Sequence, residues 1–61
     1  MSSVSNTLEA AALGARLAAD LIQDAKASAD KGHKLDASKV RLAVNELKEA
    51  ARKASAVILE A

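Results

Sequence analysis

The pattern of apolar residues in the second half of the chain predicts a long amphipathic helix. Between residues 36 and 61, apolar side chains recur at alternating spacings of four and three, which is the repeat of a helical seam. A second apolar row, with a spacing of seven, lies beside that seam. The seam comprises Val40, Val44, Leu47, Ala51, Ala54, Ile58 and Ala61, and the second row comprises Ala43, Ala50 and Val57. A stripe of this width needs more than one partner surface.

The first half of the chain predicts another helix, over about residues 7–31. Asn6 and Glu9 have the spacing of a capping box, so we expect the helix to begin near Thr7. Small residues dominate its three apolar heptad rows. The rows are Val4, Ala11, Ala18 and Ala25; Leu8, Ala15, Ile22 and Ala29; and Thr7, Gly14, Leu21 and Ser28. We interpret Gly14 as a residue that lets a facing helix backbone approach closely.

Turn-forming residues concentrate between the two predicted helices, at residues 32–36. Gly32 is the expected left-handed residue that ends the first helix, and Asp36 is the expected N-cap of a second helix over about residues 37–60. A connection this short joins antiparallel neighbours. The sequence therefore predicts an all-α fold, in which residues 1–61 form a single antiparallel two-helix hairpin.

The composition indicates that this hairpin oligomerises. The chain has 61 residues, no aromatic residue and no Cys, and sixteen of its residues are Ala. Small domains usually gain stability from disulfides, a metal or oligomerisation, and here we expect oligomerisation. A dimer forming a four-helix bundle is favoured because two-fold assemblies are the commonest, although the same heptads also suit a larger ring or cage.

Charge and hydropathy indicate a soluble cytoplasmic protein. The formal net charge is +1, so any binding of anions must be local. The chain has no basic start followed by an apolar run, and no uncharged apolar stretch approaches the length of a membrane span. We therefore expect no export signal and no membrane partner.

Few residues are suited to catalysis, so we expect no enzymatic activity. His33 lies in the turn with no Cys or motif-placed Ser to activate, and one His per chain does not predict a metal site. Asp20 and Asp24 share a helical face, but Arg16 lies one turn before Asp20, at a spacing that allows the two to pair. We expect neither a cofactor nor a metal.

A basic stripe on the second helix is the main candidate for a binding site. It consists of Arg41, Asn45, Lys48 and Arg52, which share one helical face. Glu46, Glu49 and Glu60 are expected on the opposite flank. Arg supplies bidentate donors, Lys a point charge and Asn a contact to a base or sugar, so the stripe suits a small anionic ligand such as a nucleotide. The alternative is a solvated basic face, or a salt-bridge edge matched to Asp20 and Asp24 of a neighbouring copy.

Two helices and a short turn in a chain of this length resemble the Rop-type plasmid RNA-binding hairpins, which pair into four-helix bundles. The plan and the basic stripe also resemble, in outline, small phage-encoded helical proteins that sequester nucleotide signals within oligomers. Neither resemblance extends to motif residues, so no functional residue is carried over. Two functions remain open: an oligomer that binds or sequesters a small anion or RNA, and a structural or protein-adaptor oligomer that acts through its Ala-rich seam.

Overall fold

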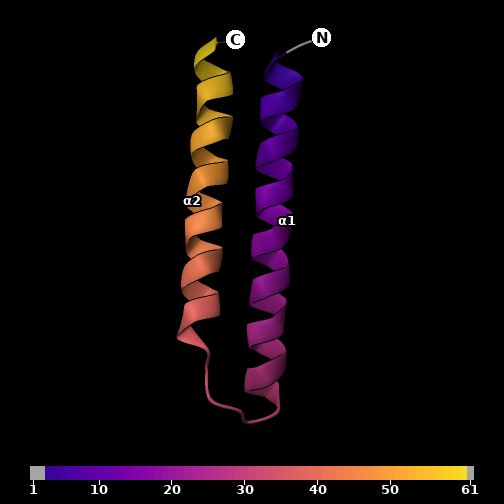
Figure 1. Ribbon diagram of the computed structural model, residues 1–61, viewed down its shortest axis with the longest axis vertical. Helices are drawn as coiled ribbons and strands as arrows, with labels where there is room; N and C mark the ends of the chain where they lie inside the picture. Colours follow the sequence, from indigo (N-terminus) through magenta and orange to yellow (C-terminus); the bar gives the residue numbers. More distant parts are fainter. Residues whose placement is uncertain (1–2, 61) are drawn as a thin grey trace.

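The computed structural model describes residues 3–60, which form two antiparallel helices (Figure 1). Helix α1 spans Ser3–Asp30 and helix α2 spans Ala37–Glu60. They lie side by side along their length, and the principal extents are 46 × 16 × 12 Å. The predicted all-α class and the helical hairpin are confirmed.

Helix α1 begins one turn earlier than the sequence predicts. Asn6 lies inside the helix, and the Thr7 hydroxyl donates a hydrogen bond of 2.8 Å to the carbonyl oxygen of Ser3. The predicted capping box between Asn6 and Glu9 is therefore wrong. The extra turn carries Val4 into the heptad row that faces α2, where it is half-buried. Burial of this apolar side chain favours helix in a segment whose own helix propensity is modest.

The turn closes through the cap residues predicted from the sequence. Gly32 has a φ of 78°, and its N–H donates to Ala29 at 3.0 Å while the N–H of His33 donates to Ser28 at 2.9 Å. These two bonds form a Schellman motif. Asp36 Oδ1 then accepts hydrogen bonds from the backbone N–H groups of Ser38 and Lys39 at the start of α2, at 3.1 and 3.4 Å.

The contact between the helices is built from small side chains. The buried residues are Ala11, Ala18, Ala25 and Ala43. Within the described part of the chain, no large side chain is fully buried. The hairpin is a single layer of two helices, so each helix has only one neighbour to cover an apolar stripe that is wider than one contact.

Gly14 faces α2 as expected and the backbone of Glu46 approaches it, but this approach does not require glycine in place of alanine. A Cβ atom at this position would lie 3.7 Å from the backbone oxygen of Glu46 and 4.0 Å from Ala50 Cβ, which are ordinary van der Waals distances. The backbone separation therefore leaves room for a methyl group.

The space beside Gly14 gives a prediction. Because alanine loses less backbone entropy in a helix than glycine, Gly14→Ala is expected to raise the free energy of unfolding by about 0.5–1 kcal/mol. Urea denaturation at a fixed protein concentration measures this change. Destabilisation by the added methyl would mean that the helices lie closer together than described.

Candidate functional site: an apolar face and a basic stripe

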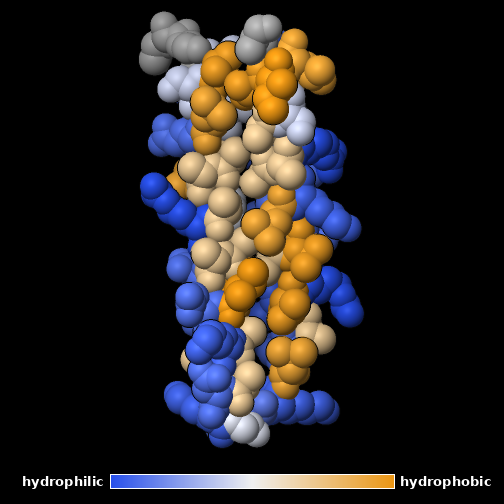
Figure 2. Space-filling model, turned by 180° about the vertical axis from the view of Figure 1, so that it is seen from behind, coloured by the Kyte–Doolittle hydropathy of each residue, from blue (hydrophilic) through white to orange (hydrophobic). Residues whose placement is uncertain are grey.

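Exposed apolar side chains, half of them alanines, cover one broad side of the hairpin (Figure 2). On each helix these side chains lie one or four residues after a member of the row that faces the other helix. That row contains the buried Ala11 and Ala18 on α1 and the buried Ala43 on α2. Since both helices are right-handed and run antiparallel, these flanking rows fall on the same side of the molecule. We call this surface the apolar face. It comprises Leu8, Ala12, Ala15, Ala19 and Ile22 of α1 and Val44, Leu47, Ala51, Ala54 and Ile58 of α2.

The predicted seam of the second helix is not the contact between the two helices. Ala43, Ala50 and Val57, the second row of the sequence pattern, face α1 instead. Val40 and Ala54 of the predicted seam are half-buried at the edge of that contact. The remaining described seam residues, Val44, Leu47, Ala51 and Ile58, are exposed, and Ala61 lies outside the described residues. The alanine row permits the closer helix contact, which leaves the bulkier row uncovered.

The exposed area is larger than a folded chain of this mass normally shows. The chain exposes 4692 Å², whereas a compact protein of 6.3 kDa exposes about 3,700 Å². The radius of gyration is 14.3 Å, against about 10.5 Å for a compact domain of this length. The excess area resembles the roughly 800 Å² that each partner buries in a standard protein interface.

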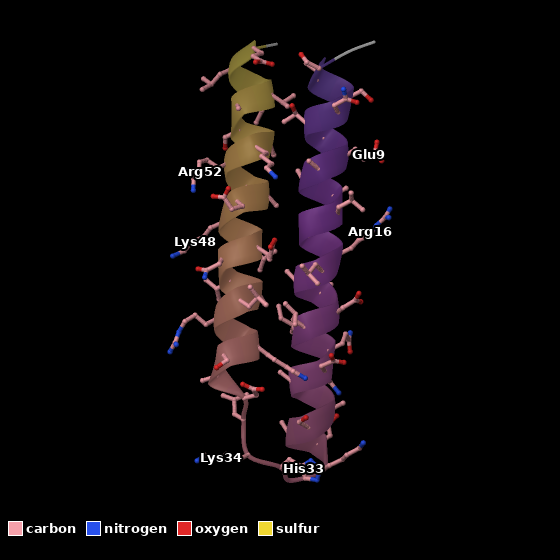
Figure 3. All side chains as sticks on the ribbon, viewed as in Figure 1. Glu9, Arg16, His33, Lys34, Lys48 and Arg52 are labelled. Atoms are coloured by element: carbon pink, nitrogen blue, oxygen red, sulfur yellow. The ribbon has the colours of Figure 1, made fainter. Side chains whose placement is uncertain are left out.

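The basic stripe lies on the outer side of α2. Lys48 and Arg52 project away from α1 (Figure 3), and all four members of the stripe are exposed. Arg41, Asn45 and Lys48 make no hydrogen bond or ion pair through their side chains within residues 3–60. Arg41 and Lys48 are seven residues apart, so their helix positions differ by about 10 Å along the axis. Two unpaired cations therefore project from the same side of one rigid helix.

Arg52 differs from the rest of the stripe, because Glu49 forms an ion pair with its guanidinium group. The expectation that acidic residues stay on the opposite flank is therefore wrong for Glu49. Its spacing of three residues from Arg52 is one at which helical side chains meet. The exposed cationic part of the stripe is thus centred on Arg41 and Lys48.

The other candidate residues form no assembled site in the described part of the chain. Asp20 and Asp24 are exposed, and Arg16 forms no ion pair with Asp20. Further along α1, an ion pair joins Lys26 and Asp30, with 2.8 Å between Lys26 Nζ and Asp30 Oδ2. His33 is exposed in the turn (Figure 3). Among residues 3–60 there is no group of three or more potential metal ligands and no pocket.

The sequence does not single out Arg16 as a candidate, because its spacing from Asp20 allows an ion pair. In the structure Arg16 is exposed and projects from α1 on the side away from α2 (Figure 3). It lies one turn from both Ala12 and Ala19, at the edge of the apolar face. Lys48 has the same relation to Val44 and Ala51. This shared position relative to the apolar rows is visible in the sequence once those rows are identified.

Comparison of the chain with protein-family models, curated proteins and solved structures finds no match. Neither α1 nor α2 is long and apolar enough to cross a membrane. Function is therefore inferred from two features of the hairpin itself, the apolar face and the basic stripe.

Proposed function

We propose that this protein is a non-enzymatic homo-oligomer, in its simplest form a dimer in which two hairpins pack as a four-helix bundle and hold a small anionic ligand on the basic stripe. The observation that carries the proposal is the exposed apolar face, which extends over both helices (Figure 2). A second copy supplies a matching apolar surface. The two-fold arrangement is the commonest solution for such a contact.

The small side chains between α1 and α2 support the need for a partner. Burial of one alanine methyl contributes about 0.8 kcal/mol, whereas ordering one residue on folding costs about 1.5 kcal/mol. The larger apolar side chains remain largely outside the contact, and Leu47 and Ile58 are 43% and 74% exposed. Packing against a second copy is what turns these side chains into a core.

The unpaired charges of Arg41 and Lys48 support binding of an anion. Their guanidinium and ammonium groups provide donors for phosphate oxygens, and Asn45 between them has an amide that can contact a base or sugar. Because rigid helices hold these donors, a ligand binds without the cost of ordering a loop. Binding itself is then the activity, as in sequestration of a nucleotide, and no general base is required.

Titration of the oligomer with ATP, cyclic AMP and a short RNA tests the ligand. Arg41→Ala and Lys48→Ala are each expected to weaken nucleotide binding about 10- to 100-fold, since a lost charged hydrogen bond costs about 1.5–3 kcal/mol. Arg52→Ala is expected to have a smaller effect because Glu49 already neutralises Arg52. Isothermal titration calorimetry measures the affinities, and sedimentation confirms that the copy number is unchanged.

Lys53→Ala is the matched control, because it removes the same charge from an exposed residue of α2 outside the stripe. Equal weakening by Lys53→Ala would indicate general charge attraction. If the wild type binds no anion, or if the stripe variants bind as well as the wild type, the structural or protein-adaptor function takes the place of ligand binding. Tight RNA binding that weakens steeply with salt would instead favour a Rop-like RNA-binding hairpin.

A further inference from the structure

At two levels of the apolar face, large and small residues alternate between the two helices. Gly14 lies between Glu46 and Ala50, and this contact fixes which residues of α1 and α2 are level with one another. In this register, there are two positions along the face at which a large side chain of one helix and a small side chain of the other helix lie at the same height along the helix axes. These two pairs are Leu8 with Ala54 and Ala15 with Leu47. Ile22 lies level with Val40, which is outside the apolar face.

This alternation distinguishes two ways of pairing the apolar faces about a two-fold axis. If the axis is parallel to the helices, α1 packs on α2 of the partner at the same level, so that Leu8 faces Ala54 of the partner subunit and Ala15 faces Leu47 of the partner subunit. If the axis is perpendicular to the helices and passes through the middle of the face, each helix packs on its own copy. Leu47 then meets Leu47 of the partner subunit at the level where Ala15 meets Ala15 of the partner subunit.

Close packing favours the parallel axis. Large side chains opposite small ones interdigitate and keep the helix separation even, as dense cores require. With the perpendicular axis, two opposed leucines hold one pair of helices apart at the level where two opposed alanines leave a gap. In the parallel arrangement both turns lie at the same end of the bundle, and each α1 is covered by the partner's α2.

The parallel arrangement also brings basic residues of different subunits together. Within one chain Arg16 and Lys48 project in opposite directions, away from the neighbouring helix (Figure 3), so they cannot share a ligand. Each residue directly follows a member of a level pair, Arg16 after Ala15 and Lys48 after Leu47. Because the two helices run in opposite directions, these two steps move apart along the axis, and at the outer rim of the dimer Arg16 lies within about 3 Å of the level of Lys48 of the partner subunit.

We propose that these two residues, with Arg41 of the partner subunit, form a phosphate-binding site that spans the subunit boundary and is repeated twice in the dimer. Two like charges facing each other across an interface are unfavourable, and a bound phosphate group between them removes the repulsion. The site deepens the anion-binding function proposed above and rests on it. It adds a ligand-binding residue on α1 and makes the site incomplete in a single chain.

Mixing two inactive variants tests this site, with ATP as the probe. Arg16→Ala and Lys48→Ala are each expected to weaken ATP binding at least tenfold. After equimolar mixing, unfolding and refolding, half of the dimers contain one chain of each kind, and one of the two sites in these dimers is intact. Equilibrium dialysis should therefore recover about a quarter of the wild-type high-affinity sites.

Mixing Arg41→Ala with Lys48→Ala provides the matched control. Both changes lie on the same helix, so no mixed dimer contains an intact site and no recovery is expected. Circular dichroism and sedimentation of each variant establish that the fold and the copy number are retained.

The outcomes separate this inference from the function on which it rests. Undiminished ATP binding by Arg16→Ala would overturn the shared site while leaving the stripe and the oligomer in place. Loss of binding by both variants without recovery on mixing would overturn the parallel arrangement. A wild type that binds no ATP, or that is a folded monomer, would overturn the proposed function itself.

Discussion

Ala18→Leu is expected to lower the free energy of unfolding by about 1–3 kcal/mol, because a larger side chain in a packed contact forces the surrounding structure apart. Ala18 is 0% exposed, as is Ala43 on the facing helix. The extra carbon atoms have no void to occupy, so α1 and α2 must separate along the line of buried alanines. For a chain of this size each kcal/mol corresponds to a fall in Tm of about 4–8 °C.

Ala27→Leu is the matched control for this prediction. Ala27 is exposed on the same helix, so the substitution is expected to change the free energy of unfolding by no more than about 0.5 kcal/mol. Thermal denaturation followed by circular dichroism, with all proteins at one concentration, measures both effects. Equal shifts for Ala18→Leu and Ala27→Leu would contradict the assignment of Ala18 to the contact between the helices.

The hairpin follows from local signals in the sequence. Gly32 and Asp36 determine the turn because only a few residue types suit a left-handed φ or cap free backbone amides, and both roles are confirmed. The capping pattern of Asn6 and Glu9 predicts that α1 starts at Thr7. The structure extends α1 to Ser3 because burial of Val4 against α2 is a tertiary effect, which a local cap signal does not contain.

The contact face of each helix could not be assigned from periodicity alone. In α2 the rows that contain Ala43 and Leu47 lie side by side, and both are apolar with a heptad spacing. Hydrophobicity favours burial of the row with Leu47, whereas close approach to α1 favours the row with Ala43. The second effect determines the contact within the chain and leaves Leu47 exposed. The sequence predicted the need for two partner surfaces but not which row each surface covers.

The candidate site was predicted in part. The helical spacing correctly placed the basic stripe on one exposed side of α2, because helix geometry alone fixes that relation. The ion pair between Glu49 and Arg52 was missed, although a spacing of three residues allows it. The spacing of Arg16 and Asp20 also allows an ion pair, which the structure does not contain. Charged pairs on a solvated helix have weak energies, so spacing does not decide between them.

The second large effect is expected from Leu47→Asp, which places a carboxylate in the middle of the apolar face. If the face is covered by a second copy, this carboxylate is buried without a partner, which costs several kcal/mol. The dissociation constant of the oligomer is therefore expected to rise at least about a hundredfold. Because the contact within one hairpin is built from alanines, dissociation should be accompanied by loss of helix.

Leu13→Asp is the matched control for Leu47→Asp. Leu13 is 56% exposed, slightly more than Leu47 at 43%, and lies near the middle of α1. At about 100° per residue, its direction from the helix axis differs by about 160° from that of Ala15 in the apolar face. The same change at Leu13 should therefore leave the oligomer and its helix content intact. Equal dissociation by both variants would mean that assembly does not depend specifically on the apolar face.

Sedimentation equilibrium of the wild type at low micromolar concentration, alongside Leu47→Asp and Leu13→Asp and with helix content followed by circular dichroism, tests the central claim most directly. A mass of at least two 6.3 kDa chains is expected for the wild type and for Leu13→Asp, together with a monomeric and largely unfolded Leu47→Asp. A wild-type chain that is fully helical at the mass of one chain would contradict assembly through the apolar face.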